Sequence, residues 1–140
     1  MLNDDNLSKV FDQAYKSMDK ETSKQTAKKV DEKIDTLSKN LPSIFEAIWD
    51  DIKLISSLLQ DYWNNKYIDI SWTTIAIISV ALAYLIIPLD IVPDVIPIMG
   101  YIDDALIIRI ALQLISIELD RYRLYLLLQA DKKSMKTTTL

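Results

Sequence analysis

Residues 70–89 read ISWTTIAIISVALAYLIIPL and contain no charged side chain. About 20 uncharged residues are enough for a helix to cross the apolar core of a bilayer. Serine and threonine hydroxyls supply the polar groups of this run, and they can bond to carbonyls of their own helix. We therefore predict one helix that is solvated by lipid. It should end around Ile87, because a proline disfavours helical geometry in the residue before it.

An aromatic cluster stands just before and at the start of this run. Its members are Tyr62, Trp63, Tyr67 and Trp72. Such side chains favour the headgroup level of a membrane, where the ring is apolar and its NH or OH remains hydrated. The alternative is ordinary aromatic packing in the core of a helical bundle. Beside an uncharged run, the cluster favours a membrane interface.

A second apolar segment, residues 105–117, is interrupted by Arg109 and Gln113. These two polar side chains are four residues apart, so a helix places them on one side, where lipid contact would be costly. We expect that side to face a partner helix or the connector between the two segments. The segment can span the bilayer, enter it part-way or lie at its surface. The pattern predicts an all-α fold, with N-terminal amphipathic helices followed by a membrane-type helical hairpin.

The basic residues predict how such a hairpin would be oriented. Residues 88–104 contain no lysine or arginine, whereas both flanks of the hairpin contain several. Basic residues favour the cytoplasmic side of a membrane. We therefore expect an inner-membrane protein with both termini in the cytoplasm and the acidic connector on the other side.

The N-terminal part predicts amphipathic helices. Apolar residues recur at helical spacing over residues 7–18 and again over 30–41. Between them, residues 19–29 contain Ala27 as their one apolar side chain, which predicts either a helix solvated all round or a hinge. Pro42 suits the first turn of a further helix, which we expect to end near Asn64.

Four lysines at a spacing of four residues would align on one side of an N-terminal helix. They are Lys16, Lys20, Lys24 and Lys28. Contact with acidic lipid headgroups is one interpretation of this stripe. Acidic residues are interspersed along the same segment, so a solvated face is the interpretation that we favour.

Composition excludes several classes of function. The chain of 140 residues has no cysteine and no histidine, which removes thiol catalysis, the usual zinc sites and Ser-His nucleophile pairs. Its single glycine, Gly100, removes phosphate-cradling glycine-rich loops. A net charge of −4 argues against general nucleic-acid binding. We expect a protein that is not an enzyme and needs no cofactor.

The connector combines prolines and aspartates at fixed spacing. Its punctuating residues are Pro88, Asp90, Pro93, Asp94, Pro97, Gly100, Asp103 and Asp104. The prolines fix backbone angles and remove amide donors, which predicts a rigid path between the helices. Asp103 is a good cap for the following helix, and Asp104 suits its first turn.

Two interpretations of the four connector aspartates stay open. Helix capping, together with an ion pair to Arg109, explains most of them, and we favour it. The alternative is a cation site for Ca²⁺ or Mg²⁺, because these ions prefer oxygen ligands.

This connector resembles the signature of the YkvA-like family, a small bacterial domain of unknown function. The family pattern runs Pro-x-Asp-x-x-Pro-Asp-x-x-Pro-x-x-Gly-x-x-Asp-Asp after a tyrosine and two or three apolar residues, and residues 84–104 fill every punctuating position. The resemblance implies a membrane-associated helical protein and no established activity. It suggests a charged helical arm over residues 1–59, a YkvA-like hairpin domain over 60–131 and a polar tail over 132–140.

Three functions are compatible with this sequence. The leading hypothesis is a small membrane protein that binds membrane lipid and a protein partner or a second copy of itself. The second is a soluble helical bundle that acts as an interaction module, with residues 70–89 as a helix surrounded on all sides. The third is a cation-linked function of the connector aspartates.

Overall fold

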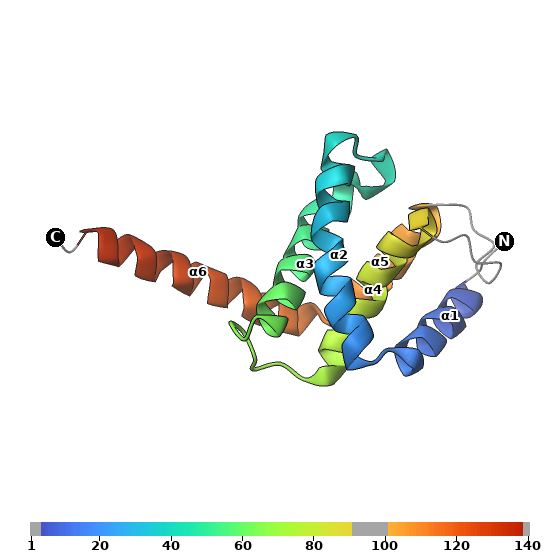
Figure 1. Cartoon of the computed structure of the whole chain (residues 1–140), viewed down its shortest axis with the longest axis horizontal. Helices are drawn as coiled ribbons and strands as arrows, with labels where there is room; N and C mark the ends of the chain where they lie inside the picture. The colour runs from blue at the N-terminus through green and yellow to red at the C-terminus, as the bar shows by residue number, and fades with distance from the viewer. Residues whose placement is uncertain (1–3, 91–100, 139–140) are drawn as a thin grey trace.

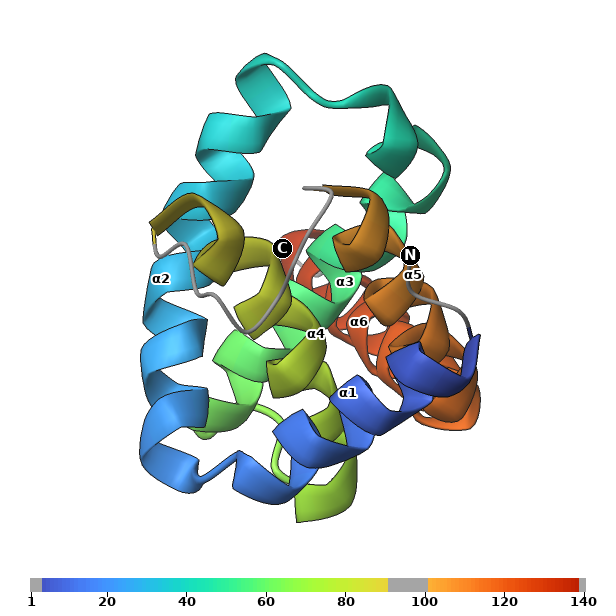
Figure 2. The ribbon, with the colours of Figure 1, turned by 90° about the vertical axis from the view of Figure 1, so that its right-hand side faces the viewer.

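The computed structural model describes the backbone of residues 4–90 and 101–138, which form helices and no strands. Figures 1 and 2 show their arrangement in two views. The elements are α1 (Asp4–Ser17), α2 (Lys20–Lys39), the 3₁₀ helix η1 (Ser43–Ile48), α3 (Trp49–Trp63), α4 (Trp72–Asp90), α5 (Tyr101–Leu114) and α6 (Ser116–Thr138).

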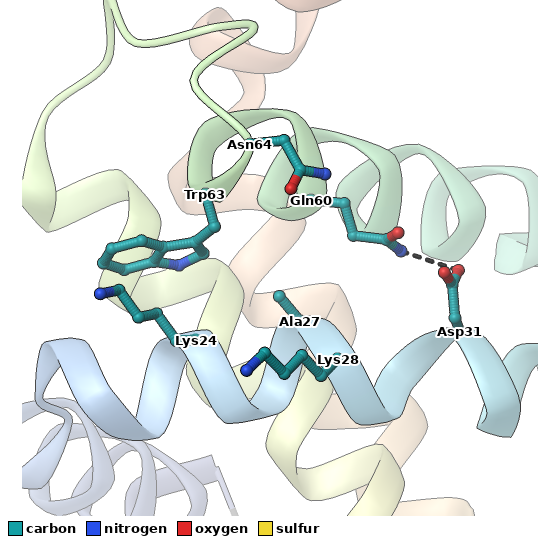
Figure 3. A pocket seen from close by; sticks show the side chains of 7 residues that line it. All are labelled: Lys24, Ala27, Lys28, Asp31, Gln60, Trp63 and Asn64. Carbon is teal, nitrogen blue, oxygen red and sulfur yellow. Dashed lines mark hydrogen bonds between the residues drawn. The ribbon is translucent and has the colours of Figure 1, made fainter.

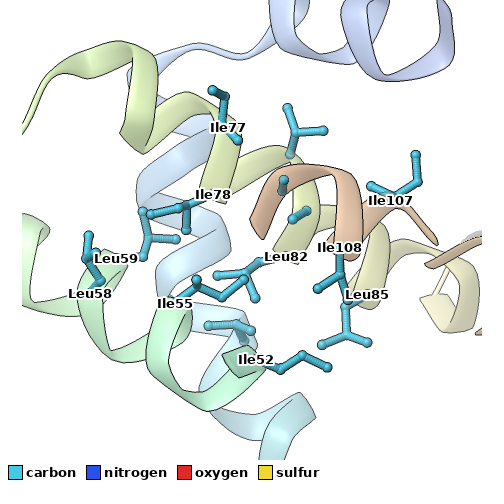
Figure 4. Packing of buried hydrophobic residues seen from close by; sticks show 14 of the residues in the cluster. Ile52, Ile55, Leu58, Leu59, Ile77, Ile78, Leu82, Leu85, Ile107 and Ile108 are labelled. Carbon is cyan, nitrogen blue, oxygen red and sulfur yellow. The ribbon is translucent and has the colours of Figure 1, made fainter. Parts of the chain in front are cut away.

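Helix α4 is the centre of the bundle. It contacts α1, α2, α3 and α5, and its contacts with α2 and α5 are the most extensive in the described part of the chain. The side chains of Ile75, Ile78, Leu82 and Leu85 are fully buried. Figure 4 shows how α3 and α5 contribute isoleucines and leucines to the same apolar cluster. The run without charges is therefore covered by the protein's own helices.

This packing bears on the predicted membrane hairpin. Helices α4 and α5 do pack against each other, so the pair exists in the fold. The prediction that α4 is solvated by lipid is not confirmed, because nearly every side chain from Thr74 to Ile86 is buried within the bundle. Among the residues that the structure describes, we find no helix with the length and apolar character required to cross a bilayer.

Helix α2 corrects both interpretations of residues 19–29. Asp19 caps this helix by accepting a hydrogen bond from the Thr22 backbone N–H at 2.7 Å, so the chain turns just before α2 and not within it. The segment is also not solvated all round, since Ser23, Thr26 and Ala27 are buried. Small side chains allow close packing of α2 on α4, and periodicity of large apolar residues does not reveal such a face.

The start of the third helical segment differs from the expected α-helix. Pro42 is the N-cap of η1, no side chain makes a cap hydrogen bond there, and α-helical geometry begins only at Trp49. The predicted end of this segment is confirmed. Asn64 is the C-cap of α3, and Asn65 has a left-handed φ of 61°.

Helix α6 projects from the bundle. Its first turns are attached through the buried side chains of Leu119 and Tyr122, and Ile115 is buried at the junction with α5. Its second half extends away from the other helices (Figure 1).

We predict that Leu82→Ala lowers the free energy of unfolding by about 2–5 kcal/mol, because it leaves a cavity in the centre of the bundle. Ile68→Ala is the matched control. Ile68 is 66% exposed, so its truncation should change stability by less than about 0.5 kcal/mol. Urea unfolding followed by circular dichroism measures both values. Equal stability of the two variants would contradict the enclosed position of α4.

Candidate functional site

Exposed apolar side chains occur at the end of α5 and along α6. They are Leu114, Ile117, Leu124, Leu127 and Leu128, which are 51–73% exposed, and we call this set the α5–α6 apolar surface. Ile117, Leu124 and Leu128 are separated by seven and four residues, which places them on one side of α6. Asp120 and Arg121 are exposed between Ile117 and Leu124 on that side, so the neighbouring apolar side chains are Leu124, Leu127 and Leu128. Single exposed leucines are normal, but a neighbouring set marks an interaction site.

The far half of this surface belongs to the projecting part of α6. No other described helix lies beside this part (Figure 1). The exposed side chains of Lys132 and Lys133 follow the leucines along the same helix. Leu127 and Leu128 therefore form an apolar patch that is followed by positive charge.

A hydrogen-bonded tyrosine attaches α6 to α3. The buried Tyr122 hydroxyl donates to Asp61 Oδ2 at 2.6 Å and lies 2.7 Å from Ser57 Oγ. The rings of Tyr67 and Tyr125 pack around Tyr122, at centroid distances of 5.1 and 5.9 Å. Burial, aided by the Asp61 carboxylate, raises the pKa of Tyr122 well above its ordinary value. This junction fixes the direction in which α6 leaves the bundle.

Ion pairs supplement the tyrosine junction. Arg123 lies 3.0 Å from Asp51 of α3 and 2.9 Å from Asp120 of its own helix, and Arg121 lies 3.3 Å from Asp69. All three pairs are partly exposed, so each contributes little by itself.

The four aromatic residues predicted for a membrane interface are partly buried against the hydrophobic cluster: Tyr62, Trp63, Tyr67 and Trp72. The Trp63 indole donates to Ser23 Oγ at 2.9 Å, and Tyr62 packs edge-on against Trp63. Tyr67 belongs to the tyrosine junction. These positions agree with the alternative of core packing, and contact of these rings with lipid stays a prediction.

The ends of the connector are described only as backbone. Helix α4 extends past Pro88 to Asp90, so the predicted end at Ile87 is three residues too early. A proline near the end of a helix removes one amide donor and leaves the other backbone bonds in place. Asp103 and Asp104 both lie inside the first turn of α5, which begins at Tyr101. Asp103 is therefore not the N-cap, and both positions favour negative charge at a helix start.

The remaining connector predictions fall outside the described residues. Pro93, Asp94, Pro97 and Gly100 lie there, and so do the side chains of Asp90, Asp103 and Asp104. The predicted ion pair of Arg109 involves these same carboxylates. Arg109 and Gln113 are both exposed on α5. In the part of the chain with described side chains, no group of three or more residues could hold a metal ion.

A cleft between α2 and α3 was not expected from the sequence. Its volume is about 300 Å³ and it is lined by Lys24, Ala27, Lys28, Asp31, Gln60, Trp63 and Asn64 (Figure 3). The Lys24 ammonium lies 5.1 Å from the centroid of the Trp63 ring. The four-residue spacing of the lysines was the available signal, but the sequence did not show that α3 lies opposite them.

Comparison with known proteins addresses the connector and the helices on either side of it. Residues 74–110 match the model of a family described as a protein of unknown function (DUF1232). A relative from Bacillus subtilis (strain 168), named "Uncharacterized membrane protein YkvA", is 38% identical over 65 residues. The resemblance to the YkvA-like family is confirmed.

The YkvA-like match covers part of each protein. The aligned region is 46% of this chain and 61% of the B. subtilis relative. The family model begins at Thr74 in α4 and ends at Ile110 in α5, so α1–α3 and the projecting α6 lie outside it. No solved structure matches the chain.

We predict that Tyr122→Phe destabilises the protein by about 1–2 kcal/mol, because Asp61 and Ser57 both lose a partner at a buried junction. Tyr62→Phe is the matched control, since the Tyr62 hydroxyl has no hydrogen bond among the described residues. Urea unfolding at neutral pH measures both. An unchanged midpoint for Tyr122→Phe would contradict the role of this hydroxyl.

The raised pKa of Tyr122 also predicts a pH dependence of stability. The folded state favours the neutral phenol, whereas in the unfolded chain tyrosine ionises near pH 10. The contribution of Tyr122 is therefore fully present below about pH 10 and is lost as the pH rises above it. Unfolding free energies measured from pH 8 to 11 should fall more steeply for the wild type than for Tyr122→Phe. Parallel curves would contradict this prediction.

Proposed function

We propose that this protein is a small non-enzymatic helical protein that associates with a membrane and binds a partner there. The α5–α6 apolar surface is the observation that supports this proposal. Residues such as Leu124, Leu127 and Leu128 are more than half exposed on α6, whose second half extends away from the other described helices. A lipid surface or a protein partner would remove them from water.

The energetics favour a lipid surface for the projecting half of α6. Full burial of a leucine contributes about 1.5–3 kcal/mol, so half-exposed leucines entering the apolar boundary contribute on the order of 1 kcal/mol each. Each lysine near an anionic membrane adds about 1 kcal/mol. The sequence of α6 holds five basic and three acidic residues, which suits an anionic surface although the whole chain is acidic.

The name of the B. subtilis relative supports the same proposal. That protein is called a membrane protein, and the aligned region is 46% of this chain. The proposal that the chain is not an enzyme rests on its composition, since cysteine and histidine are absent. The partner could be another protein or a second copy of this chain.

An interaction module that works without a membrane is the alternative function. The enclosed position of α4 favours it, because a bundle that buries its most apolar helix has no need of lipid there. In that case the α5–α6 apolar surface would accept an apolar helix of a partner. Flotation with lipid vesicles distinguishes the two functions.

We predict that Leu127→Gln with Leu128→Gln lowers the fraction bound to vesicles of phosphatidylcholine and phosphatidylglycerol by at least about tenfold. The physical reason is that two neutral polar side chains replace the apolar patch, at a loss on the order of 1 kcal/mol each. Flotation in a density gradient measures the bound fraction. Absence of wild-type binding would reject the membrane proposal in favour of the interaction module.

Ile44→Gln with Ala47→Gln is the matched control for this experiment. Both residues are exposed on η1, away from α6, and the same neutral polar side chains are introduced. This control should bind vesicles as the wild type does. An equal loss in both variants would show that the apolar patch on α6 does not determine binding.

A membrane-inserted hairpin is a second candidate state, with both termini in the cytoplasm and the connector on the other side. The charge-free run of residues 70–89 favours it. Insertion would require α2 and α3 to leave α4, since they cover it in the bundle. The chain lacks cysteine, so Ile98→Cys introduces a single reactive thiol. Labelling from the outer side alone would support insertion, and labelling from the cytoplasmic side would exclude it.

A further inference from the structure

The cleft between α2 and α3 has a fixed aromatic wall. Trp63 Nε1 donates to Ser23 Oγ at 2.9 Å, and Ser23 Oγ lies 2.6 Å from Ser79 Oγ. The Ser79 hydroxyl donates to the Ile75 carbonyl at 2.7 Å, so its proton is used there and the Ser23 hydroxyl donates to Ser79. Both serines are fully buried. Rotation of the indole would leave a buried hydroxyl without its donor, which holds the ring in place.

The charges of the cleft are separated along its length. Figure 3 shows the ammonium groups of Lys24 and Lys28 toward the Trp63 end and the Asp31 carboxylate at the opposite end. Asp31 accepts a hydrogen bond from Gln60 Nε2 at 2.8 Å. Among the described residues, Lys28 has neither an ion pair nor a hydrogen bond, and the Lys24 ammonium rests on the Trp63 ring.

We propose that the Trp63 end of this cleft binds a phosphate monoester. Two lysines one helical turn apart can both approach a doubly charged anion with three terminal oxygens, and the Asn64 amide in the same cleft is a neutral donor. The indole ring supplies an apolar surface for the carbon part of the ester. A volume of about 300 Å³ is larger than a phosphate ion needs, which leaves space for that part.

Two sources share this chemistry: a free phosphate compound and the headgroup of phosphatidic acid. The inference goes beyond the proposed function and does not rest on it, because the α2–α3 cleft and the α5–α6 apolar surface share no residue. Binding of a free phosphate needs no membrane at all.

The first arm of the test titrates the full-length protein with inorganic phosphate at constant ionic strength. The readout is the indole N–H signal of Trp63 in a ¹H–¹⁵N spectrum, assigned by its absence in Trp63→Phe. The second arm measures flotation with phosphatidylcholine vesicles that contain either phosphatidic acid or phosphatidylglycerol at the same surface charge. A saturable shift in the first arm supports a free ligand. Stronger recruitment by phosphatidic acid than by phosphatidylglycerol, without a shift in the first arm, supports the headgroup.

The double variant Lys24→Gln with Lys28→Gln should weaken binding by about tenfold or more, since each charge-assisted contact contributes about 1.5–3 kcal/mol. Lys20→Gln with Lys29→Gln removes the same charge from α2 outside the cleft and should bind within about twofold of the wild type. Equal weakening in both variants would assign binding to diffuse charge and overturn the site. No binding by the wild type in either arm would overturn it too.

The two proposals can fail separately in these experiments. Leu127→Gln with Leu128→Gln should bind inorganic phosphate as the wild type does, because it leaves the cleft unchanged. Loss of phosphate binding in that variant would contradict the cleft as an independent site. Vesicle binding that is lost without any change in phosphate binding would confirm that the two sites are separate.

Discussion

Burial of α4 by the helices around it is the interaction on which the rest of the structure depends. Side chains such as Ile78 and Leu82 have no charged or strongly polar neighbour on their own helix, so every side of α4 must be covered. Helices α2, α3 and α5 provide that cover, and α1 adds to it. The apolar faces of α2 and α3 therefore pack against one helix, and the buried apolar residues from Phe11 to Leu59 belong to the same cluster as those of α4 and α5.

Helix type and position could be predicted from the sequence, because apolar spacing reports which residues one helix buries. The helix end at Asn64-Asn65 followed from the tolerance of asparagine for left-handed geometry, which Asn65 adopts. The environment of α4 could not be predicted in the same way. A helix of twenty uncharged residues is compatible with lipid and with a protein core. Which environment it adopts depends on how much apolar surface the other helices offer to cover it. Ser23, Thr26 and Ala27 of α2 offer a close-packing face that hydrophobic periodicity does not detect.

The candidate sites were less predictable than the fold. Leu124, Leu127 and Leu128 continue an apolar pattern that also suits a core helix, so their exposure follows only from the projection of α6 beyond α3. The cleft depends on residues 24–31 meeting residues 60–64, which are about thirty positions away in the sequence. Two lysines on one helix do not predict a cleft until the helix that lies opposite them is known. The YkvA-like motif, by contrast, was recognisable because its spacing is local.

The buried serines link the cleft to the enclosed helix. Ser79 is the polar residue at the centre of α4, and its hydroxyl bonds to its own helix and to Ser23 of α2. In a helix that faces lipid, the Ser79 hydroxyl would bond only to a backbone carbonyl of its own helix. In the bundle the same hydroxyl also bonds to Ser23, and Ser23 accepts a hydrogen bond from the Trp63 indole in the cleft. Any motion that separates α2 from α4, including insertion of a hairpin, therefore breaks this series of hydrogen bonds and releases the Trp63 wall. Occupation of the cleft would stabilise the closed bundle, because a ligand that binds one state shifts the equilibrium toward it.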